Sequence, residues 1–160
     1  MSRLSKPLAY FLTWTTYGTW LHGDPRGSVD DTHNLYGHPY LSNEPDRRLK
    51  AQNTLVETPF RMGDAARNIV KKAIIDHAAM REWRTLALSV QTNHVHLVIL
   101  AAIHTPEQIM AQCKSWATRR LREAELLGVR KRVWTKMGST RWLWNEKALL
   151  AAIDYTKRMQ

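Results

Sequence analysis

Apolar and polar residues follow one another along the first two thirds of the chain in patterns that predict three strands and one helix. Aromatic and β-branched residues fill positions 7–16, which is typical of a strand. Positions 62–80 repeat apolar side chains at helical spacing, and positions 82–90 and 93–101 are strand-like runs joined by a tight turn. Glycines and prolines break the pattern in between, so we expect a long insertion at about 18–61.

The last third of the chain carries clear helix signals. Positions 105–108, Thr-Pro-Glu-Gln, have the form of a capping box, and we expect the helix that they begin to end at Gly128. Short strands are expected over 132–135 and 140–144. Asn145 is a suitable N-cap for a final helix.

This order of elements predicts an α+β fold. It fits a ferredoxin-like split βαβ sandwich with an antiparallel sheet, a long insertion after strand 1 and an appended C-terminal helix. The length of 160 residues and the hydrophobic content of 44% suit one domain that spans 1–160. In this topology the first and third strands are neighbours in the middle of the sheet.

The chain is strongly basic, with 24 Lys and Arg residues against 14 Asp and Glu residues and a pI near 10.1. Such a charge favours a polyanionic partner, nucleic acid first, while a general solubilising surface is the alternative. Much of the excess lies between 114 and 147, on the flanking or outer faces of the second helix and in the segment after it. The candidate DNA contacts there are Lys114, Arg119, Arg122, Arg130, Lys131 and Arg132.

Cysteine usage and apolar run lengths indicate a cytoplasmic location. Cys113 is the only cysteine, so an intrachain disulfide cannot form. The longest apolar stretches are strand-length, far below the roughly 20 residues of a membrane span, and we recognise no signal peptide. We therefore expect no membrane association.

His94 and His96 are the most informative residues of the chain. Alternate residues of a strand point to the same face, so the two imidazoles project together, about 6–7 Å apart. Such a pair can converge on one divalent cation, and two hydrogen-bonded core histidines are the alternative. Val98 and Leu100 continue the same face, which places the pair at the polar end of an apolar strand.

Tyr155 is the candidate partner of this pair. A terminal helix that crosses the same face of the sheet can bring Tyr155 over the histidines. On a helical wheel it lies at the edge of the apolar stripe formed by Leu149, Ile153 and Thr156. A tyrosine that merely extends from the core to solvent would occupy the same position.

The assembled pattern resembles a known family. Its parts are Phe11-Leu-Thr-Trp-Thr-Thr-Tyr-Gly-Thr-Trp-Leu21, Asn93-His-Val-His-Leu-Val98, a basic helix beginning near Thr105, Trp142-Leu-Trp144 and a tyrosine on the last helix. Together they are similar to the single-tyrosine HUH transposases, which include the REP-associated tyrosine transposases and insertion-sequence transposases of the same fold. The similarity covers nearly the whole chain.

The resemblance implies a DNA transposase that cleaves and rejoins single-stranded DNA. His94 and His96 would bind Mg²⁺ or Mn²⁺, and Tyr155 would be the nucleophile that forms a 5′-phosphotyrosine and frees a 3′-hydroxyl. Many relatives complete the metal site with a polar residue four positions after the tyrosine, where this chain has Met159. Gln160 or water is then expected to take that place.

The resemblance also implies partners. Single-stranded or hairpin DNA is the expected substrate, with Arg26 of the insertion meeting a phosphate or a base edge. Relatives include both monomers and dimers that exchange the tyrosine helix, so a homodimer is possible. The alternatives are a non-catalytic DNA-binding protein that has decayed from such an enzyme, and a nickase of the replication-initiator type.

Overall fold

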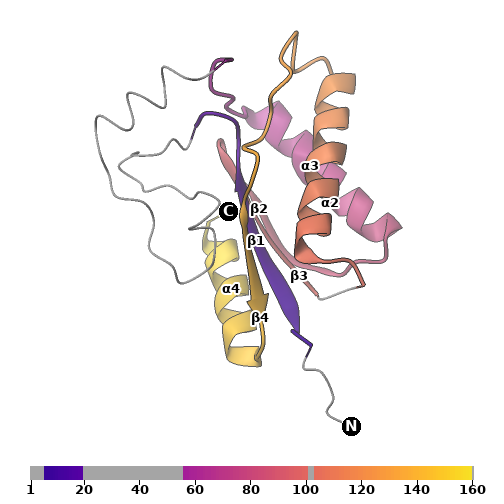
Figure 1. Ribbon diagram of the computed structural model, residues 1–160, viewed down its shortest axis with the longest axis vertical. Coiled ribbons are helices and arrows are strands. Elements are labelled where there is room, and N and C mark those ends of the chain that lie inside the picture. The colour runs from indigo at the N-terminus through magenta and orange to yellow at the C-terminus, as the bar shows by residue number, and fades with distance from the viewer. Residues whose placement is uncertain (1–5, 20–55, 101–102, 160) are drawn as a thin grey trace, which may run out of the picture.

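The computed structural model describes residues 6–19, 56–100 and 103–159 as a sheet with helices on both faces (Figure 1). Its elements are β1 (Ala9–Thr15), α2 (Asp64–Met80), β2 (Thr85–Val90), β3 (His94–Leu100), α3 (Pro106–Glu123), β4 (Ser139–Leu143) and α4 (Glu146–Arg158).

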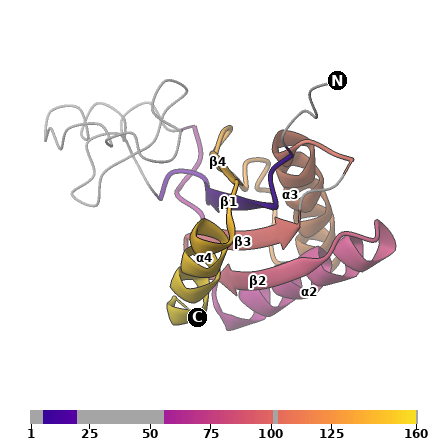
Figure 2. The same ribbon diagram turned by 90° about the horizontal axis from the view of Figure 1, so that it is seen from below.

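The four strands form one antiparallel sheet in the order β2-β3-β1-β4. β1 and β3 lie in the middle, as the sequence predicts for a ferredoxin-like sheet. Helices α2 and α3 cover one face and α4 covers the other, which both views show (Figures 1 and 2). The α+β prediction with an appended C-terminal helix is therefore confirmed.

Alternation along the strands divides the core into two parts. Leu12, Trp14 and Leu97 point toward α2 and α3 and belong to the larger hydrophobic cluster. Phe11 and Val98 point toward α4 and belong to the smaller one. The histidine pair shares the parity of Val98, so it lies on the α4 face.

Helices α3 and α4 begin where the sequence predicts, but α3 ends earlier than predicted. Thr105 accepts a hydrogen bond from the Gln108 amide and the reciprocal bond completes the capping box. The predicted end at Gly128 is wrong, because α3 ends at Glu123 and Glu125 takes a positive φ of 59°. The buried stripe of α3 ends at Leu121 and residues 122–126 are exposed, while Leu127 returns to the core after the helix has ended.

The strand predicted over 132–135 is also absent. A single bridge between Thr16 and Trp134 is all that forms there. Just before β4, a Cβ at Gly138 would lie 2.7 Å from the Thr13 carbonyl oxygen and 2.7 Å from Met110 Sδ, so only glycine fits at this position. The chain therefore meets β1 closely at this glycine and pairs regularly only from Ser139 onward.

Of the predicted insertion, residues 20–55 lie outside the described residues. The returning segment, 56–63, contains neither helix nor strand. Among the helices that the structure describes, none combines the length and the apolar character that crossing a membrane requires.

Candidate functional site

The histidine pair lies on β3, one of the two central strands, on the face that α4 covers. Along the strands, the pair is near one end of the sheet. His94 pairs with Thr15 of β1, and His96 pairs with Thr13 of β1 and Ser89 of β2. The two imidazole ring centroids are 4.8 Å apart. The structure thus brings both rings to one place, as strand alternation predicts.

Neighbouring polar groups hold each imidazole by its Nδ1 atom. Asn93 Oδ1 lies 2.7 Å from His94 Nδ1, and Thr13 Oγ1 lies 2.9 Å from His96 Nδ1. An amide oxygen only accepts, so His94 carries its proton on Nδ1 and its lone pair on Nε2. Hydrogen bonds of this kind are the usual way in which proteins orient metal-binding histidines.

His96 is the more deeply buried member of the pair, with 6% of its surface exposed. Its ring stacks on Phe11 at a centroid distance of 5.7 Å. Burial, with a smaller contribution from the charge of His94, lowers the pKa of His96 from 6.5 to about 4. The imidazole is therefore neutral at pH 7, which is the form that binds metals.

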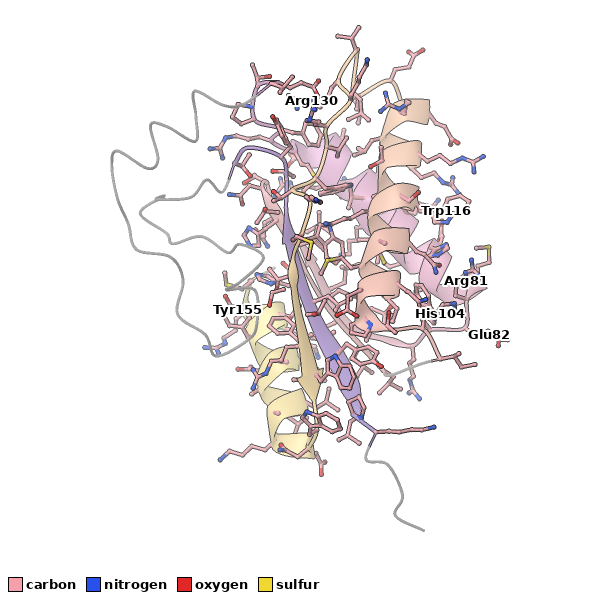
Figure 3. The ribbon with its side chains drawn as sticks, viewed as in Figure 1. Arg81, Glu82, His104, Trp116, Arg130 and Tyr155 are labelled. Atoms are coloured by element: carbon pink, nitrogen blue, oxygen red, sulfur yellow. The ribbon has the colours of Figure 1, made fainter. Side chains whose placement is uncertain are left out.

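Tyr155 lies beside this pair, on α4 of the same chain. Its ring centroid is 5.4 Å from that of His96 and 6.1 Å from that of Phe11, in edge-to-face geometry in both cases. The side chain is 42% exposed, and Figure 3 shows it on the side of the sheet opposite Trp116 of α3. A partly exposed tyrosine hydroxyl beside two imidazoles can meet a substrate that approaches from solvent.

The donor set fits a divalent cation in part. A neutral His96, and a His94 whose Nδ1 is held by Asn93, offer imidazole nitrogens that suit a transition metal or Mn²⁺. Hard cations such as Mg²⁺ require further oxygen ligands. Within the ranges that the structure describes, His, Cys, Asp and Glu form no group of three or more that would supply a full ligand set.

Two predicted site residues fall outside the described residues, namely Gln160 and Arg26. Met159 is described, and it is the C-cap residue of α4. Its thioether is a poor ligand for a hard cation, while its backbone carbonyl is bound by side chains of the sheet. Nothing in the described part of the chain therefore tests Gln160 as a ligand.

Lys114 lies on a half-buried flank of α3, within the flanking or outer faces expected from the sequence. Its Nζ donates to the carbonyl oxygens of Thr135 and Met137, at 2.9 and 3.4 Å. Burial lowers the pKa of the Lys114 ammonium from 10.5 to about 8. The long aliphatic stem reaches across the helix surface to the segment before β4, so this lysine joins two parts of the fold.

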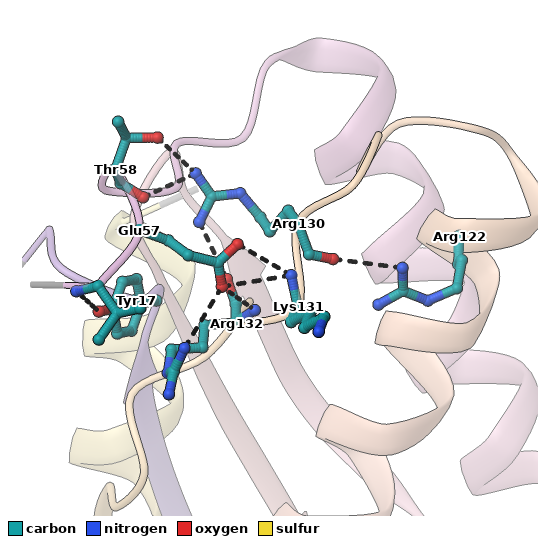
Figure 4. Close-up of polar contacts among 8 residues, drawn as sticks. Tyr17, Glu57, Thr58, Arg122, Arg130, Lys131 and Arg132 are labelled. Atoms are coloured by element: carbon teal, nitrogen blue, oxygen red, sulfur yellow. Dashed lines mark hydrogen bonds and ion pairs between the residues drawn. The ribbon is translucent and has the colours of Figure 1, made fainter.

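Arg130, Lys131 and Arg132 lie in a network that ties the returning end of the insertion to the chain after α3 (Figure 4). Arg130 donates to the Thr58 carbonyl at 2.7 Å and to its hydroxyl at 3.0 Å. The Glu57 carboxylate accepts from the backbone amides of Lys131 and Arg132, at distances from 2.6 to 3.2 Å. These backbone bonds, with the nearby guanidinium groups, lower the pKa of Glu57.

We call this network the Glu57 clamp and define it as Glu57, Thr58 and residues 130–132. Tyr17 follows β1 and connects it to the sheet, since its amide donates to the Val133 carbonyl and its hydroxyl accepts from the Val56 amide. The clamp therefore lies near the end of the sheet that carries His94. The Arg130 guanidinium binds Thr58 and the Arg132 guanidinium lies 3.9 Å from the Glu57 carboxylate, while the Lys131 and Arg132 residues remain exposed.

Arg119 and Arg122 lie on α3, and the sheet separates them from the histidine pair. Arg119 lies over the Trp116 ring at 5.0 Å and forms an exposed ion pair with Glu123 at 3.2 Å. Arg122 donates to the Arg130 carbonyl at 3.3 Å. The six basic candidates are thus distributed over two regions rather than gathered around the site.

Sequence reasoning missed several side chains of the site. Thr13 and Phe11 of β1 contact His96, and Ser89 and Gln91 contact the end of α4. The alternation of strand residues could have suggested Ser89 and Gln91, because they are polar residues two positions apart at the end of an apolar strand and so point to the same face. Their partners became visible only with the register between β2 and β3.

No protein-family model and no curated protein sequence matches the chain. Several solved structures have a similar fold. One is a candidate transposase from Deinococcus radiodurans R1, with 15% identity and a TM-score of 0.52, covering 100% of this chain and 97% of that protein. Another is a REP-associated tyrosine transposase bound to a REP hairpin, with 15% identity and a TM-score of 0.50, covering 98% of this chain and 68% of that protein.

These similarities show that the chain has the fold of the tyrosine transposases. The predicted fold class is confirmed over almost the whole length of the chain. The function of the chain is therefore argued from the residues of the site.

Proposed function

We propose that the chain is a DNA transposase that cleaves and rejoins single-stranded DNA through Tyr155. The observation that carries this proposal is the position of the Tyr155 ring, 5.4 Å from His96 and beside His94 in one chain. The shared fold of the two transposase structures supports the same reading. DNA binding alone would require neither the buried imidazole nor the tyrosine over it.

The proposed reaction is a transesterification. Tyr155 Oη attacks the scissile phosphorus and loses its proton to solvent, which reaches the partly exposed ring. The bond from phosphorus to the 3′ oxygen breaks, and that oxygen gains a proton to become a 3′-hydroxyl. The phosphate stays on Tyr155 and on the 5′ end of the other strand segment, so no energy source is needed to rejoin the ends.

His94 and His96 are the residues that would hold a divalent cation, Mg²⁺ or Mn²⁺. When bound, such a cation supplies positive charge next to the phosphate and stabilises the charge that develops there. The contribution of this chain is to keep His96 neutral through burial, and to orient both imidazoles through the hydrogen bonds of Asn93 and Thr13. Gln160 remains a candidate further ligand.

The proposed substrate is single-stranded DNA with a hairpin. One of the fold relatives is bound to a REP hairpin, and the net charge of +10 suits a nucleic acid partner. The exposed Lys131 and Arg132 side chains near the His94 end of the sheet are candidate phosphate contacts. A homodimer is compatible with this substrate but is not needed to bring Tyr155 to the histidines.

A tyrosine substitution tests the proposal. An end-labelled single strand that carries a hairpin is incubated with Mn²⁺ or Mg²⁺ and analysed on a denaturing gel for a protein–DNA adduct. Tyr155→Phe removes one oxygen, so the adduct should disappear while DNA binding persists. Tyr10→Phe makes the same change on the opposite face of the sheet and should leave the adduct intact. An adduct that persists in Tyr155→Phe would place the nucleophile elsewhere.

A further inference from the structure

The C-terminal end of α4 is bound to the sheet by two polar side chains. Ser89 Oγ donates to the Met159 carbonyl at 3.1 Å. Gln91 Nε2 donates to the same carbonyl and also to Ser89 Oγ, the latter at 2.7 Å. The last carbonyls of a helix have no partner within the helix, and here the sheet supplies donors for one of them.

This contact is connected directly to Tyr155. The Met159 amide donates to the Tyr155 carbonyl at 3.2 Å, so the bound peptide group lies one turn after the tyrosine. On the sheet, Ser89 pairs with His96, and the Gln91 amide donates to the His94 carbonyl at 2.8 Å. The same hairpin therefore carries the histidine pair and both donors that hold the tyrosine helix.

The apolar contacts of α4 with the sheet come from side chains that are small or partly buried. Its buried residues are Ala152 and Thr156, both small, and the larger Leu149 and Ile153 are partly buried and pack against the smaller cluster. Tyr155 itself lies at the exposed edge of the helix. After Thr156 no residue of α4 is buried, so the hydrogen bonds to the Met159 carbonyl are the described contacts of the end of the helix with the sheet.

We propose that Ser89 and Gln91 are positioning residues that hold Tyr155 over the histidine pair of its own chain. Their effect on cleavage rests on the proposed function, whereas their effect on the position of Tyr155 does not. Losing the contact frees the last turn of α4. A displacement of about 1 Å at a reacting group can lower a rate by about 10²-fold.

Three variants of Gln91 separate this role from that of a metal ligand. Gln91→Ala removes the donor, and Gln91→Glu keeps the size but offers only acceptors to the Met159 carbonyl. Gln91→Lys restores a donor and cannot bind a cation. Gln108→Ala is the matched control, because it removes a glutamine side chain that contacts the backbone at the start of α3, on the other face.

The first readouts are the single-turnover cleavage rate and the Kd for hairpin DNA. We expect Gln91→Ala and Gln91→Glu to lower the rate at least tenfold with a Kd within twofold of wild type. Gln91→Lys should stay within about threefold of the wild-type rate, and Gln108→Ala should cleave normally. An active Gln91→Glu together with an inactive Gln91→Lys would make Gln91 a cation ligand and overturn the positioning role.

The second readout is independent of catalysis. The His96 ring carbon and proton resonances, recorded without metal or DNA, sense the ring of Tyr155 at 5.4 Å. They should shift in Gln91→Ala and Gln91→Glu and return toward the wild-type position in Gln91→Lys. Unchanged resonances in all three variants would contradict the proposal. If the wild-type protein cleaves no DNA, the proposed function fails while this measurement still decides the positioning role.

Discussion

The stability of the metal-free protein should fall with decreasing pH because of His96. In the folded chain, burial lowers the pKa of His96 from 6.5 to about 4. The unfolded chain therefore binds a proton at this residue more readily, and stability falls as protons are added. The contribution is fully present above pH 6.5 and is lost progressively as the pH falls to about 4.

The magnitude follows from the two pKa values. At about 1.4 kcal/mol per pH unit, the change from 6.5 to about 4 corresponds to about 3 kcal/mol of unfolding free energy. This is a large share of the roughly 5–15 kcal/mol that stabilises a typical domain. His96→Gln removes the titrating group while keeping a side chain that can bond to Thr13.

Urea unfolding of both proteins from pH 7.5 to 4, in the presence of a chelator, measures this difference. Wild type should lose about 3 kcal/mol more than His96→Gln over this range. A free-energy difference between the two proteins that stays constant with pH would refute the argument. So would a His96 proton resonance in the folded wild type that titrates with a midpoint near 6.5.

Three further predictions concern residues outside the site. Lys114→Met should leave the salt dependence of hairpin DNA binding unchanged in anisotropy titrations, because the ammonium is bound to backbone carbonyls. If the affinity of the variant depended less steeply on salt concentration than that of wild type, Lys114 would be a phosphate contact. Burial raises the pKa of the Cys113 thiol to about 12, so Ellman's reagent should label it slowly in the native state and rapidly in urea; rapid native labelling would contradict this. Arg130→Ala removes the hydrogen bonds to Thr58, so it should lower the unfolding free energy by about 1 kcal/mol and speed proteolysis near residues 56–60. Unchanged proteolysis at these residues would argue against the Glu57 clamp.

Much of the fold was accessible from local sequence patterns. The capping box at Thr105 and the N-cap at Asn145 appear in the structure because they depend on residues three positions apart. Strand alternation correctly placed His94 and His96 on one face, since the period of two needs no knowledge of the partner strand. The order of elements was sufficient to predict that β1 and β3 lie in the middle of the sheet.

Local patterns are not sufficient where a distant contact decides the structure. Helical periodicity placed Lys114 on a flanking or outer face, and only the fold shows that its stem reaches carbonyls 21 and 23 positions away. The run 132–135 has the composition of a strand, yet only an isolated bridge between Thr16 and Trp134 forms there, and regular pairing with β1 begins at Ser139. Charge counting grouped Arg130 with the DNA contacts, which stays a prediction, but it gave no sign that the Arg130 guanidinium also binds Thr58.

The sequence by itself determined which residues are the candidates for the chemistry, namely two histidines on one strand face and a tyrosine on the final helix. Only the tertiary structure decided that Tyr155 meets the histidines of its own chain, and that Ser89 and Gln91 hold the end of its helix. Those hydrogen bonds join residues 70 and 68 positions apart. Contacts at such separations depend on strand register and on the docking of a helix against the sheet, because side chains that no local pattern relates become neighbours only when the whole core has packed.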